Sequence, residues 1–332
     1  MRYVEDPTIN LASLLGTSID GYVSVNGSDT KESTSCKFDS SKKISYVVTF
    51  MKEDNKTVLE TRKVSSGSAL GNLPSTRQYF TKTGGNGTEY TSTSTVTDDV
   101  MLYNSTFQYD TWSEIVANVK ANKISQYNVG DTKSVNLGTY GKHTLRLANT
   151  STPSECSTSG FSQSACGFVL EFADIITKHT INDPPTNVGG WPASSMYTFV
   201  NNDIYNAIPS EIRNAIIDTT VVSGHGSKDT SNFTSTDKLY LLAPKEIYTD
   251  WSNSYDTAKE LTRTLDYYTA QGVTTSNYNG AIKKNGTNAY YWWLRAAYSN
   301  YYFNFYGVDG NGDWNSYSAS NSYGVAPAFR LG

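Results

Sequence analysis

Charged residues are scarce in this chain, and its apolar runs are short. Asp, Glu, Lys and Arg make up 17% of the 332 residues, and the formal net charge is −4 at pH 7. Proteins that bind nucleic acid carry a basic patch that neutralises phosphates, so we expect no nucleic-acid partner. No run reaches the roughly 18 apolar residues that a membrane-spanning helix needs, so we expect no direct membrane insertion.

Cysteine and histidine are rare as well. There are three of each, at Cys36, Cys156, Cys166, His143, His179 and His225. No histidine stands at a metal-ligand spacing beside a cysteine pair, so the sequence predicts no metal site. Cys156 and Cys166 could close a short loop by a disulfide, which would stabilise the fold by about 2–3 kcal/mol. The spacing alone leaves the bonded and the free forms equally open.

Three sequence patterns typical of enzymes are missing: the phosphate-binding GxxxxGK[ST], the nucleophile elbow GxSxG and the zinc-binding HExxH. His225 stands between two glycines, which is more typical of a loop than of a catalytic site. Asp309, Asn311 and Asp313 alternate as calcium ligands could, but the closing Glu of an EF-hand loop is absent. We therefore expect no catalytic residue, no metal and no cofactor.

The first residues, 1–8, contain no apolar segment of the kind that a signal peptide requires. We expect either that the chain was trimmed at a domain boundary or that it is carried by a route that needs no signal, as a phage structural protein would be. We interpret residues 1–43 as a leader or as the remnant of a preceding module.

The C-terminal region, residues 290–332, has two apolar ends around a polar, aromatic middle. From Ala296 to Tyr323, sixteen of twenty-eight residues are Tyr, Asn or Ser. Asn and Ser lose hydration on burial, so this composition makes a poor core. It makes a good contact surface, because Tyr gives area with few rotors while Ser and Asn give adaptable hydrogen bonds. An ordinary polar loop with a turn at Asp309–Gly312 is the alternative.

Residues 107–332 resemble the variable proteins of diversity-generating retroelements. The segments that carry the resemblance are Trp292-Trp-Leu-Arg295, the turn at Asp309–Gly312, Gly324-Val-Ala-Pro-Ala-Phe-Arg-Leu331, and upstream Gly189-Gly-Trp191, Asn201–Pro209, Asp237–Glu246 and Gly272–Asn279. The resemblance implies a C-type-lectin-like fold with a variable region at residues 290–332.

The resemblance also implies which side chains support the scaffold and which contact the ligand. Frame residues hold the scaffold: Trp292, Trp293, Arg295, Gly324, Pro327 and Phe329. Variable residues contact the ligand from one face of the domain: Tyr298, Asn300, Tyr301, Tyr302, Asn304, Tyr306, Asp309, Asn311, Asp313, Trp314, Asn315, Ser316 and Tyr317.

Residues 44–105 show the alternation of short β-strands. Tyr46, Val48 and Phe50 alternate, and glycines punctuate the stretch up to Gly84-Gly-Asn-Gly87. The segments Ser45–Phe50, Val64–Leu70 and Val96–Tyr103 around this turn resemble an internalin-type B-repeat, also called a Listeria-Bacteroides repeat. The resemblance implies a small β-grasp-like module that spaces adhesive domains from a bacterial surface.

The pattern of residues 107–332 mixes helices with many short strands. Thr111 and Glu114 form a capping box before an apolar stripe at helical spacing. A helical stretch is predicted over 202–219, restarted at Pro209, where proline suits a first helical turn. A further helix is predicted over 256–271, and strands over 142–148, 167–176 and 239–243. This mixture predicts an α+β class.

We therefore expect a non-enzymatic, surface-displayed binding protein, located on the outside of a bacterium or on a phage particle. Its partner is a protein or glycan on another cell or surface. One alternative is a fixed carbohydrate-binding lectin or adhesin. Another is an enzyme like the formylglycine-generating enzymes, which share the lectin-like scaffold and need a reactive cysteine.

Overall fold

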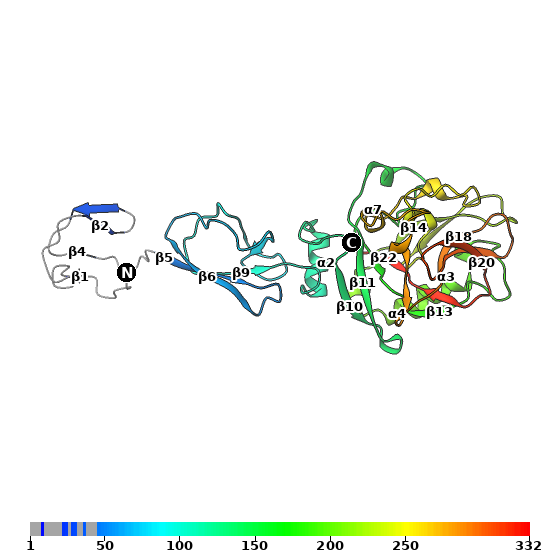
Figure 1. Ribbon diagram of the computed structural model, residues 1–332, viewed down its shortest axis with the longest axis horizontal. Helices are drawn as coiled ribbons and strands as arrows, with labels where there is room; N and C mark the ends of the chain where they lie inside the picture. Colours follow the sequence, from blue (N-terminus) through cyan, green and yellow to red (C-terminus); the bar gives the residue numbers. More distant parts are fainter. Residues whose placement is uncertain (1–7, 10–21, 26–27, 32–35, 38–44) are drawn as a thin grey trace. The chain divides into compact units, whose positions relative to one another are not determined.

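The computed structural model describes residues 8–9, 22–25, 28–31, 36–37 and 45–332. The chain divides into two compact units, unit 1 (Met1–Tyr109) and unit 2 (Asp110–Gly332) (Figure 1). Most of the predicted leader, residues 1–43, lies outside the described residues. Its described segments form two antiparallel pairs, β1 (Thr8–Ile9) with β4 (Cys36–Lys37) and β2 (Tyr22–Val25) with β3 (Ser28–Lys31).

Unit 1 is built around a five-stranded sheet in the order β6-β5-β9-β7-β8. The strands are β5 (Ser45–Met51), β6 (Val58–Ser65), β7 (Tyr79–Phe80), β8 (Glu89–Tyr90) and β9 (Val100–Asn104). The pair β5 and β9 is parallel. Val48 and Phe50 of β5 are fully buried, as their alternation predicted, and they pack in one apolar cluster with Leu102 of β9. The predicted β-rich character of this module is confirmed.

Unit 2 begins with the helix α2 (Trp112–Lys120). Glu114 N donates to Thr111 Oγ1 at 3.2 Å, and Thr111 N donates to Glu114 Oε2 at 2.8 Å. These reciprocal bonds satisfy backbone donors that the first helical turn leaves free. Trp112 and Ile115 are buried, so the predicted capping box and apolar stripe are confirmed.

Two sheets form the body of unit 2. The first is four-stranded and antiparallel, in the order β10-β11-β12-β22, and the second is five-stranded, in the order β13-β21-β18-β19-β20. Their strands are β10 (Thr132–Asn136), β11 (Lys142–Asn149), β12 (Val169–Phe172), β13 (Thr177–His179), β18 (Trp292–Ala297), β19 (Asn304–Val308), β20 (Trp314–Ser318), β21 (Tyr323–Val325) and β22 (Ala328–Arg330). Two hairpins complete the strands, β14 (Thr219–Ser223) with β15 (Phe233–Asp237) and β16 (Lys284–Asn285) with β17 (Asn288–Ala289).

The helices of unit 2 are short. They are α3 (Ser195–Phe199), the π-helix η4 (Val200–Ile204), α4 (Tyr205–Ala207), α5 (Ser210–Arg213), α6 (Pro244–Ile247) and α7 (Asp266–Ala270). The 3-10 helices are η1 (Gly138–Tyr140), η2 (Ser154–Ser157), η3 (Trp191–Ala193), η5 (Lys259–Leu261) and η6 (Asn279–Ala281).

The helical stretch predicted over 202–219 restarts after Pro209 as expected, but it begins earlier and ends earlier than predicted. Helical turns run from Ser195 to Ala207, and Ile208 is extended because it precedes Pro209. A single further turn, α5, ends at Arg213, and Thr219 begins the strand β14. The β-branched residues from Thr219 to Val222 favour that strand.

Two other predicted elements also differ. Within 256–271 the helix is limited to η5 and α7, since Thr262 between them is extended. Within 239–243 there is no strand, and only Tyr240 pairs, in an isolated bridge with Ala328. The strand predicted over 142–148 is present as β11, and the one predicted over 167–176 is present but limited to β12. The mixture of helices and strands confirms the α+β class. No helix in the described part of the chain is long and apolar enough to cross a membrane.

Candidate ligand-binding surface

The strand β18 carries the first frame segment inside the second sheet. Every residue from Trp292 to Ala297 is buried. Trp292 Nε1 donates to Ala281 O at 3.1 Å, and Trp293 Nε1 donates to His179 O at 2.9 Å. Because each indole N–H has a partner, the rings are buried without an unsatisfied donor. The frame segment therefore supports the sheet from within.

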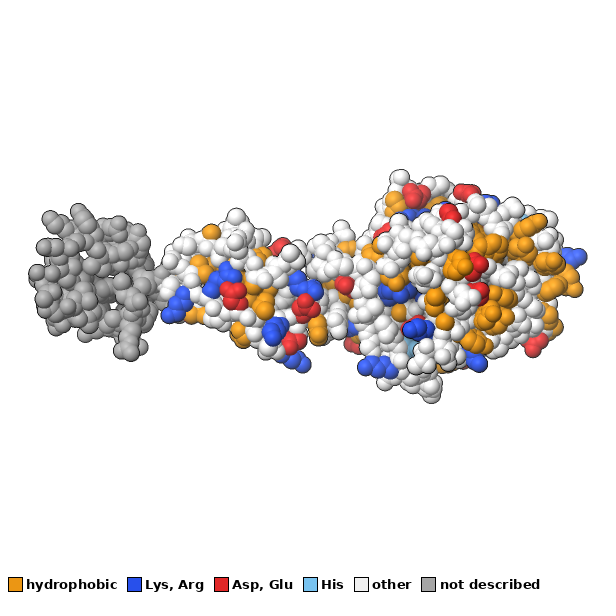
Figure 2. All heavy atoms as spheres, viewed as in Figure 1, with side chains coloured by type: hydrophobic (Ala, Val, Ile, Leu, Met, Phe, Trp, Pro, Cys, Tyr) orange, Lys and Arg blue, Asp and Glu red, His pale blue; other side chains and the backbone are white. Residues whose placement is uncertain are grey.

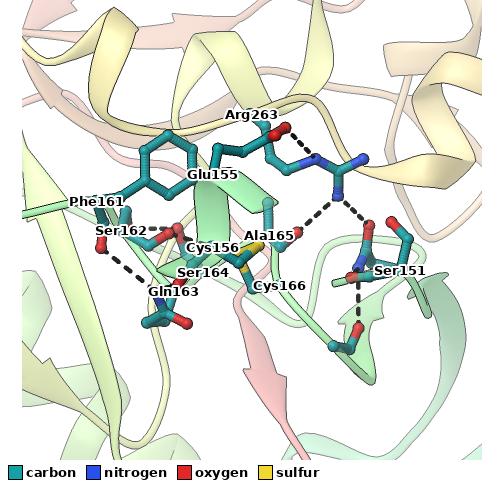
Figure 3. The surroundings of a disulfide bond; sticks show 12 residues. Ser151, Glu155, Cys156, Phe161, Ser162, Gln163, Ser164, Ala165, Cys166 and Arg263 are labelled. Carbon is teal, nitrogen blue, oxygen red and sulfur yellow. Dashed lines mark hydrogen bonds and ion pairs between the residues drawn. A yellow bond between two sulfur atoms is a disulfide. The ribbon is translucent and has the colours of Figure 1, made fainter. Parts of the chain in front are cut away.

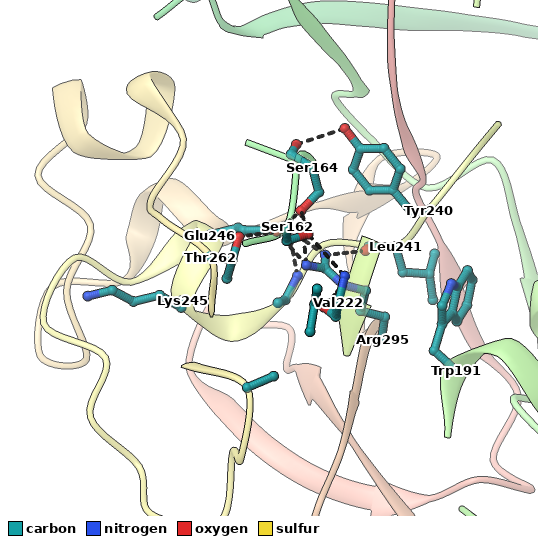
Figure 4. A network of polar contacts seen from close by, with 12 residues as sticks. Ser162, Ser164, Trp191, Val222, Tyr240, Leu241, Lys245, Glu246, Thr262 and Arg295 are labelled. Carbon is teal, nitrogen blue, oxygen red and sulfur yellow. Dashed lines mark hydrogen bonds and ion pairs between the residues drawn. The ribbon is translucent and has the colours of Figure 1, made fainter. Parts of the chain in front are cut away.

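Arg295 brings a charge into this buried strand and pairs it with Glu246 (Figure 4). Its Nη2 donates to Glu246 Oε1 at 2.5 Å, and its Nη1 donates to Oε2 at 2.6 Å. Arg295 also donates to Val222 O at 3.2 Å and to Leu241 O at 2.9 Å. The bidentate geometry suits a guanidinium and a carboxylate. The two carbonyls and Ser164 Oγ, which accepts from Nη2 at 3.1 Å, receive the remaining donors.

Hydroxyl and amide groups complete the network around Glu246. Glu246 Oε1 accepts hydrogen bonds from Ser164 Oγ and from Thr262 Oγ1, the latter at 2.7 Å. Glu246 Oε2 accepts from Ala243 N at 2.9 Å. Burial by itself would lower the pKa of Arg295, but Glu246 raises it above its usual value. Removing one partner would leave the other charge buried and unpaired, which is strongly destabilising. Arg295 thus joins β18 to α6 and to the segment before β12.

The second frame segment links the two sheets of unit 2. Residues 323–325 form β21 beside β18, and residues 328–330 form β22 beside β12. Gly324 leaves no room for a side chain, because a Cβ would lie 2.5 Å from Ile175 Cδ1. Phe172 N donates to Pro327 O at 3.0 Å, and the rings of Phe172 and Phe329 have centroids 6.4 Å apart. All six predicted frame residues are buried.

The segment between β18 and β19, residues 298–303, is here named the tyrosine loop. Ala297 before it is fully buried, but no residue from 298 to 304 is buried. Tyr301 is 48% exposed and Tyr302 is 52% exposed, and Asn300 is exposed as well. The chain therefore changes from core to surface within one residue.

The rings of the tyrosine loop form one exposed aromatic group with Tyr255. The tyrosine surface consists of Tyr255, Tyr298, Tyr301, Tyr302 and Phe303. Tyr298 lies between Tyr255 and Tyr301, with ring centroids 5.1 and 5.9 Å away, and Phe303 lies 5.8 Å from Tyr301 and 4.9 Å from Tyr302. Figure 2 shows hydrophobic side chains, tyrosine included, gathered over the part of unit 2 where Figure 1 labels β18 and β20.

Tyr255 was missed by the sequence prediction. It is 41% exposed, and its carbonyl accepts a hydrogen bond from Ser299 N at 3.1 Å. The available signal was its neighbourhood, Trp251-Ser-Asn-Ser-Tyr-Asp256, which has the same Tyr, Ser and Asn content as the variable region.

The strands β19 and β20 send the predicted contact residues to both faces of the sheet. Tyr306 pairs with Ser316, and Phe305 pairs with Tyr317. Side chains alternate along a strand, so the residues divide into two sets: Asn304, Tyr306, Trp314 and Ser316 on one face, and Asn315 and Tyr317 on the other. The predicted residues of these two strands therefore do not share a single ligand-binding face.

Tyr306 is a correction to the predicted contact set. It is fully buried, and its hydroxyl donates to Asn253 Oδ1 at 3.1 Å. The centroid of its ring lies 5.4 Å from the ring centroid of Trp251 and 5.2 Å from that of Tyr298. Burial raises the pKa of the Tyr306 hydroxyl above its usual value. Tyr306 is a core residue that supports the tyrosine surface and does not itself reach a ligand.

Trp314 and the polar residues beside it are half-buried. The Trp314 ring lies 4.9 Å from Trp251, and Asn304 Nδ2 donates to Ser316 Oγ at 3.1 Å. Trp314, Asn304 and Ser316 are intermediate in exposure, so part of each side chain remains accessible at the edge of the tyrosine surface.

A second group of tyrosines lies on the opposite face, around Tyr317. Its ring centroid is 5.6 Å from Tyr291 and 5.1 Å from Tyr323. Burial raises the pKa of both Tyr317 and Tyr323, and their neighbouring tyrosines raise it further. Tyr291 is 38% exposed, and Asn315 beside this group is exposed.

The predicted turn at Asp309–Gly312 connects β19 to β20. Asp309 Oδ1 accepts from Asn311 N at 2.8 Å and from Asp313 N at 3.1 Å. Gly312 has φ +94°, and a Cβ there would lie 2.2 Å from Tyr278 O, so glycine is required. The Asp309 carboxylate thus serves the turn. No group of three or more His, Cys, Asp or Glu residues that could hold a metal is found in the described ranges.

Cys156 and Cys166 form a disulfide, which is one of the two forms that the spacing left open (Figure 3). Around it, Gln163 Nε2 donates to Cys156 O at 2.8 Å, and Arg263 Nη1 donates to Ala165 O at 2.8 Å. Both cysteines of unit 2 are bonded, so neither offers the free thiol on which the formylglycine-generating alternative depends.

The comparisons with known proteins give a family without a described activity. Residues 168–332 match the family described as a domain of unknown function (DUF6273). The match covers just under half of the chain and includes both frame segments and the tyrosine loop. No curated protein and no solved structure matches the chain. The function is therefore inferred from the geometry of the surface.

Proposed function

We propose that unit 2 is a ligand-binding domain whose tyrosine surface contacts a protein or glycan on another cell. The observation that carries the proposal is the contrast between Tyr301 and Tyr302, each about half exposed, and the adjoining strand β18, which is wholly buried. Contiguous exposed aromatic rings mark interaction sites. Tyrosine also provides a large contact area at a low entropic cost.

We further propose that residues 290–332 are a variable region, diversified by a retroelement in a C-type-lectin-like domain. The buried frame and the exposed loop support this proposal, because exchanging loop side chains removes no core packing. The contact set that we propose retains the predicted residues of the tyrosine loop and the half-buried residues on the Tyr306 face of β19 and β20: Tyr298, Asn300, Tyr301, Tyr302, Asn304, Trp314 and Ser316.

Unit 1 fits the role of a spacer related to internalin-type B-repeats, and the chain as a whole fits a bacterial cell surface or a phage particle. A disulfide is typical of proteins in oxidising surroundings outside the cytosol, and Cys156–Cys166 supports this location.

A fixed carbohydrate-binding lectin is the second candidate. The planar rings of the tyrosine surface and the exposed amide of Asn300 beside them are groups that can pack on a sugar face and bond its hydroxyls. Both candidates use the same surface, so they differ in whether that surface varies and not in where it lies.

The binding proposal is tested with the full chain on a glycan array and on intact bacterial cells. Replacing Tyr301 and Tyr302 together by Ser should weaken binding at least ~30-fold, which is the effect of losing one strong anchor of about 2 kcal/mol. Tyr109→Ser is the matched control, since Tyr109 is 46% exposed but lies in unit 1. Equal binding by the double variant, or an equal loss in the control, would contradict the proposal.

The diversification proposal is tested by sequencing the codons of residues 290–332 across a population of the source organism or phage. We expect substitutions to concentrate in the tyrosine loop and at Trp314 and Ser316 of β20, and to spare both frame segments. A region without variation would favour the fixed lectin.

A further inference from the structure

Asn187 contacts the tyrosine loop from a segment more than a hundred residues earlier in the chain. Its side chain is fully buried, and its Nδ2 donates to Tyr301 O at 2.7 Å, to Asn304 O at 2.9 Å and to Tyr298 O at 3.3 Å. Its backbone N donates to Tyr302 O at 2.8 Å. One residue thus binds four carbonyl groups of the loop and its C-terminal boundary.

Three further hydrogen bonds that fix the loop also involve its main chain. Ser299 N donates to Tyr255 O at 3.1 Å, Ala319 N donates to Phe303 O at 2.8 Å, and Tyr298 N donates to Asn304 O at 3.0 Å. Main-chain groups are the same whatever side chain a residue carries. None of the side chains from 298 to 304 is buried, so the loop conformation depends little on their identity.

The orientation of the Asn187 amide is set by the carbonyls it binds. Turning the amide around would place Oδ1 against three carbonyl oxygens, which have no proton to donate. In the described part of the chain no group hydrogen-bonds to Oδ1. The hydrogen bonds donated by Nδ2 therefore hold the Asn187 side chain, and Nδ2 points to the loop.

Two glycines leave the space that this arrangement needs. A Cβ on Gly226 would lie 2.1 Å from Asn187 Oδ1, so alanine there would displace the amide. Gly190 N donates to Asn187 O at 3.0 Å and closes the turn after Asn187. Gly190 has φ +61°, and a Cβ on it would lie 2.4 Å from Phe233 Cδ2. The Gly189-Gly-Trp191 segment thus places Asn187 against the loop.

We propose that Asn187 is a positioning residue that clamps the main chain of the tyrosine loop and allows its side chains to change without loss of the loop conformation. The role that we assign to this clamp rests on the proposed function. A loop that presents variable contact residues needs a main-chain conformation that does not depend on those residues. Asn187 itself does not touch the ligand.

The clamp is tested by amide hydrogen exchange on the full chain, which requires no ligand. Asn187→Ala should increase exchange in peptides covering residues 298–304 by about tenfold or more, roughly the effect of one lost hydrogen bond. Exchange in β11 and β12 should remain within about twofold of the unaltered chain.

Asn149→Ala is the matched control. Asn149 is also fully buried, and its Nδ2 donates to Ser151 O at 2.8 Å and to Gly167 O at 2.9 Å, away from the loop. It should not raise exchange in the loop selectively. The clamp proposal would be overturned if Asn187→Ala left exchange in the loop unchanged. It would also be overturned if Asn187→Ala raised exchange evenly over unit 2, with no more effect on the loop than Asn149→Ala has.

Two further variants keep the test decisive if Asn187→Ala fails to fold. Gly226→Ala retains the asparagine but displaces its amide, and it should give the same loop-specific increase. The double variant of Tyr301→Ser and Tyr302→Ser should leave loop exchange within about twofold, whereas a large increase would show that side chains hold the loop. Because exchange is measured without ligand, the clamp and the binding proposal can fail separately.

Discussion

At the residue scale, two buried aspartates each accept a hydrogen bond from an indole. Trp191 Nε1 donates to Asp237 Oδ2 at 2.8 Å, and Trp251 Nε1 donates to Asp256 Oδ2 at 2.9 Å. Burial raises the pKa of both carboxyl groups, and it raises the pKa of Asp237 to about 6. The charged form of each is therefore disfavoured in the folded state.

The raised pKa of Asp237 predicts how stability depends on pH. Its folded-state pKa of about 6 lies above the ordinary 3.8, so protonation favours the folded chain. The contribution is complete below pH 3.8 and is lost as the pH rises to about 6. Asp237→Asn keeps an acceptor for Trp191 but does not titrate.

The measurement is the free energy of unfolding of the chain and of Asp237→Asn in urea. Relative to the variant, the unaltered chain should lose roughly 3 kcal/mol between about pH 4 and about pH 7. Other acids are common to both proteins and cancel in the difference. Two curves that run parallel over this range would contradict the prediction.

At the element scale, the hairpin of β19 and β20 decides which aromatic residues are accessible. The turn at Asp309–Gly312 could be predicted, because Gly and Asn favour such turns locally. The face of the sheet on which each aromatic side chain lies could not be predicted from the sequence. Aromatic residues occupy both alternating sets of positions, at Phe305 and Tyr306 in β19 and at Trp314 and Tyr317 in β20. Only packing against Trp251 assigns Tyr306 to the core.

This assignment predicts effects of very different size for Tyr302 and Tyr306, which are four positions apart in the chain. Tyr306→Ala should destabilise the chain by about 3–5 kcal/mol, because it empties a fully buried site. Tyr302→Ala should change stability by no more than about 0.5 kcal/mol, because that ring is half exposed.

Chemical denaturation of both variants checks the contrast, with Tyr306→Phe as the control. The control loses only the hydrogen bond to Asn253, which is worth about 1 kcal/mol. If Tyr306→Ala were as stable as Tyr302→Ala, the core assignment would be wrong.

At the scale of the whole molecule, contacts distant in sequence hold unit 2 together. Its C-terminal strands belong to different sheets, β21 to the second and β22 to the first. The disulfide constrains the segment that precedes β12, and the same segment supplies Ser164 to the network of Arg295 and Glu246.

Reduction of the disulfide should therefore lower stability. We expect a loss of about 2–3 kcal/mol in the free energy of unfolding when a reductant is added to the full chain. The double variant of Cys156→Ser and Cys166→Ser should be weakened already and should not respond to the reductant, although it retains Cys36. An equal response in both proteins would assign the effect to something other than this disulfide.

What the sequence determined by itself is local. The capping box at Thr111 and Glu114, the strand alternation at Tyr46, Val48 and Phe50, and the glycine turn after Asp309 all depend on residues a few positions apart. Such interactions are encoded in short windows, and the structure has them where they were predicted. The α+β class and the burial of both frame segments follow from the same local patterns.

What only the tertiary structure decided is the partner of each buried polar group and the exposure of each tyrosine. Glu246 lies 49 residues from Arg295, and Asn187 lies 114 residues from Tyr301. The helical stretch predicted over 202–219 does not reach Thr219, because Thr219 to Ser223 pair with β15. Pairing across such separations depends on how strands pack in space, since the free energy of a buried contact comes from the neighbours that the fold supplies.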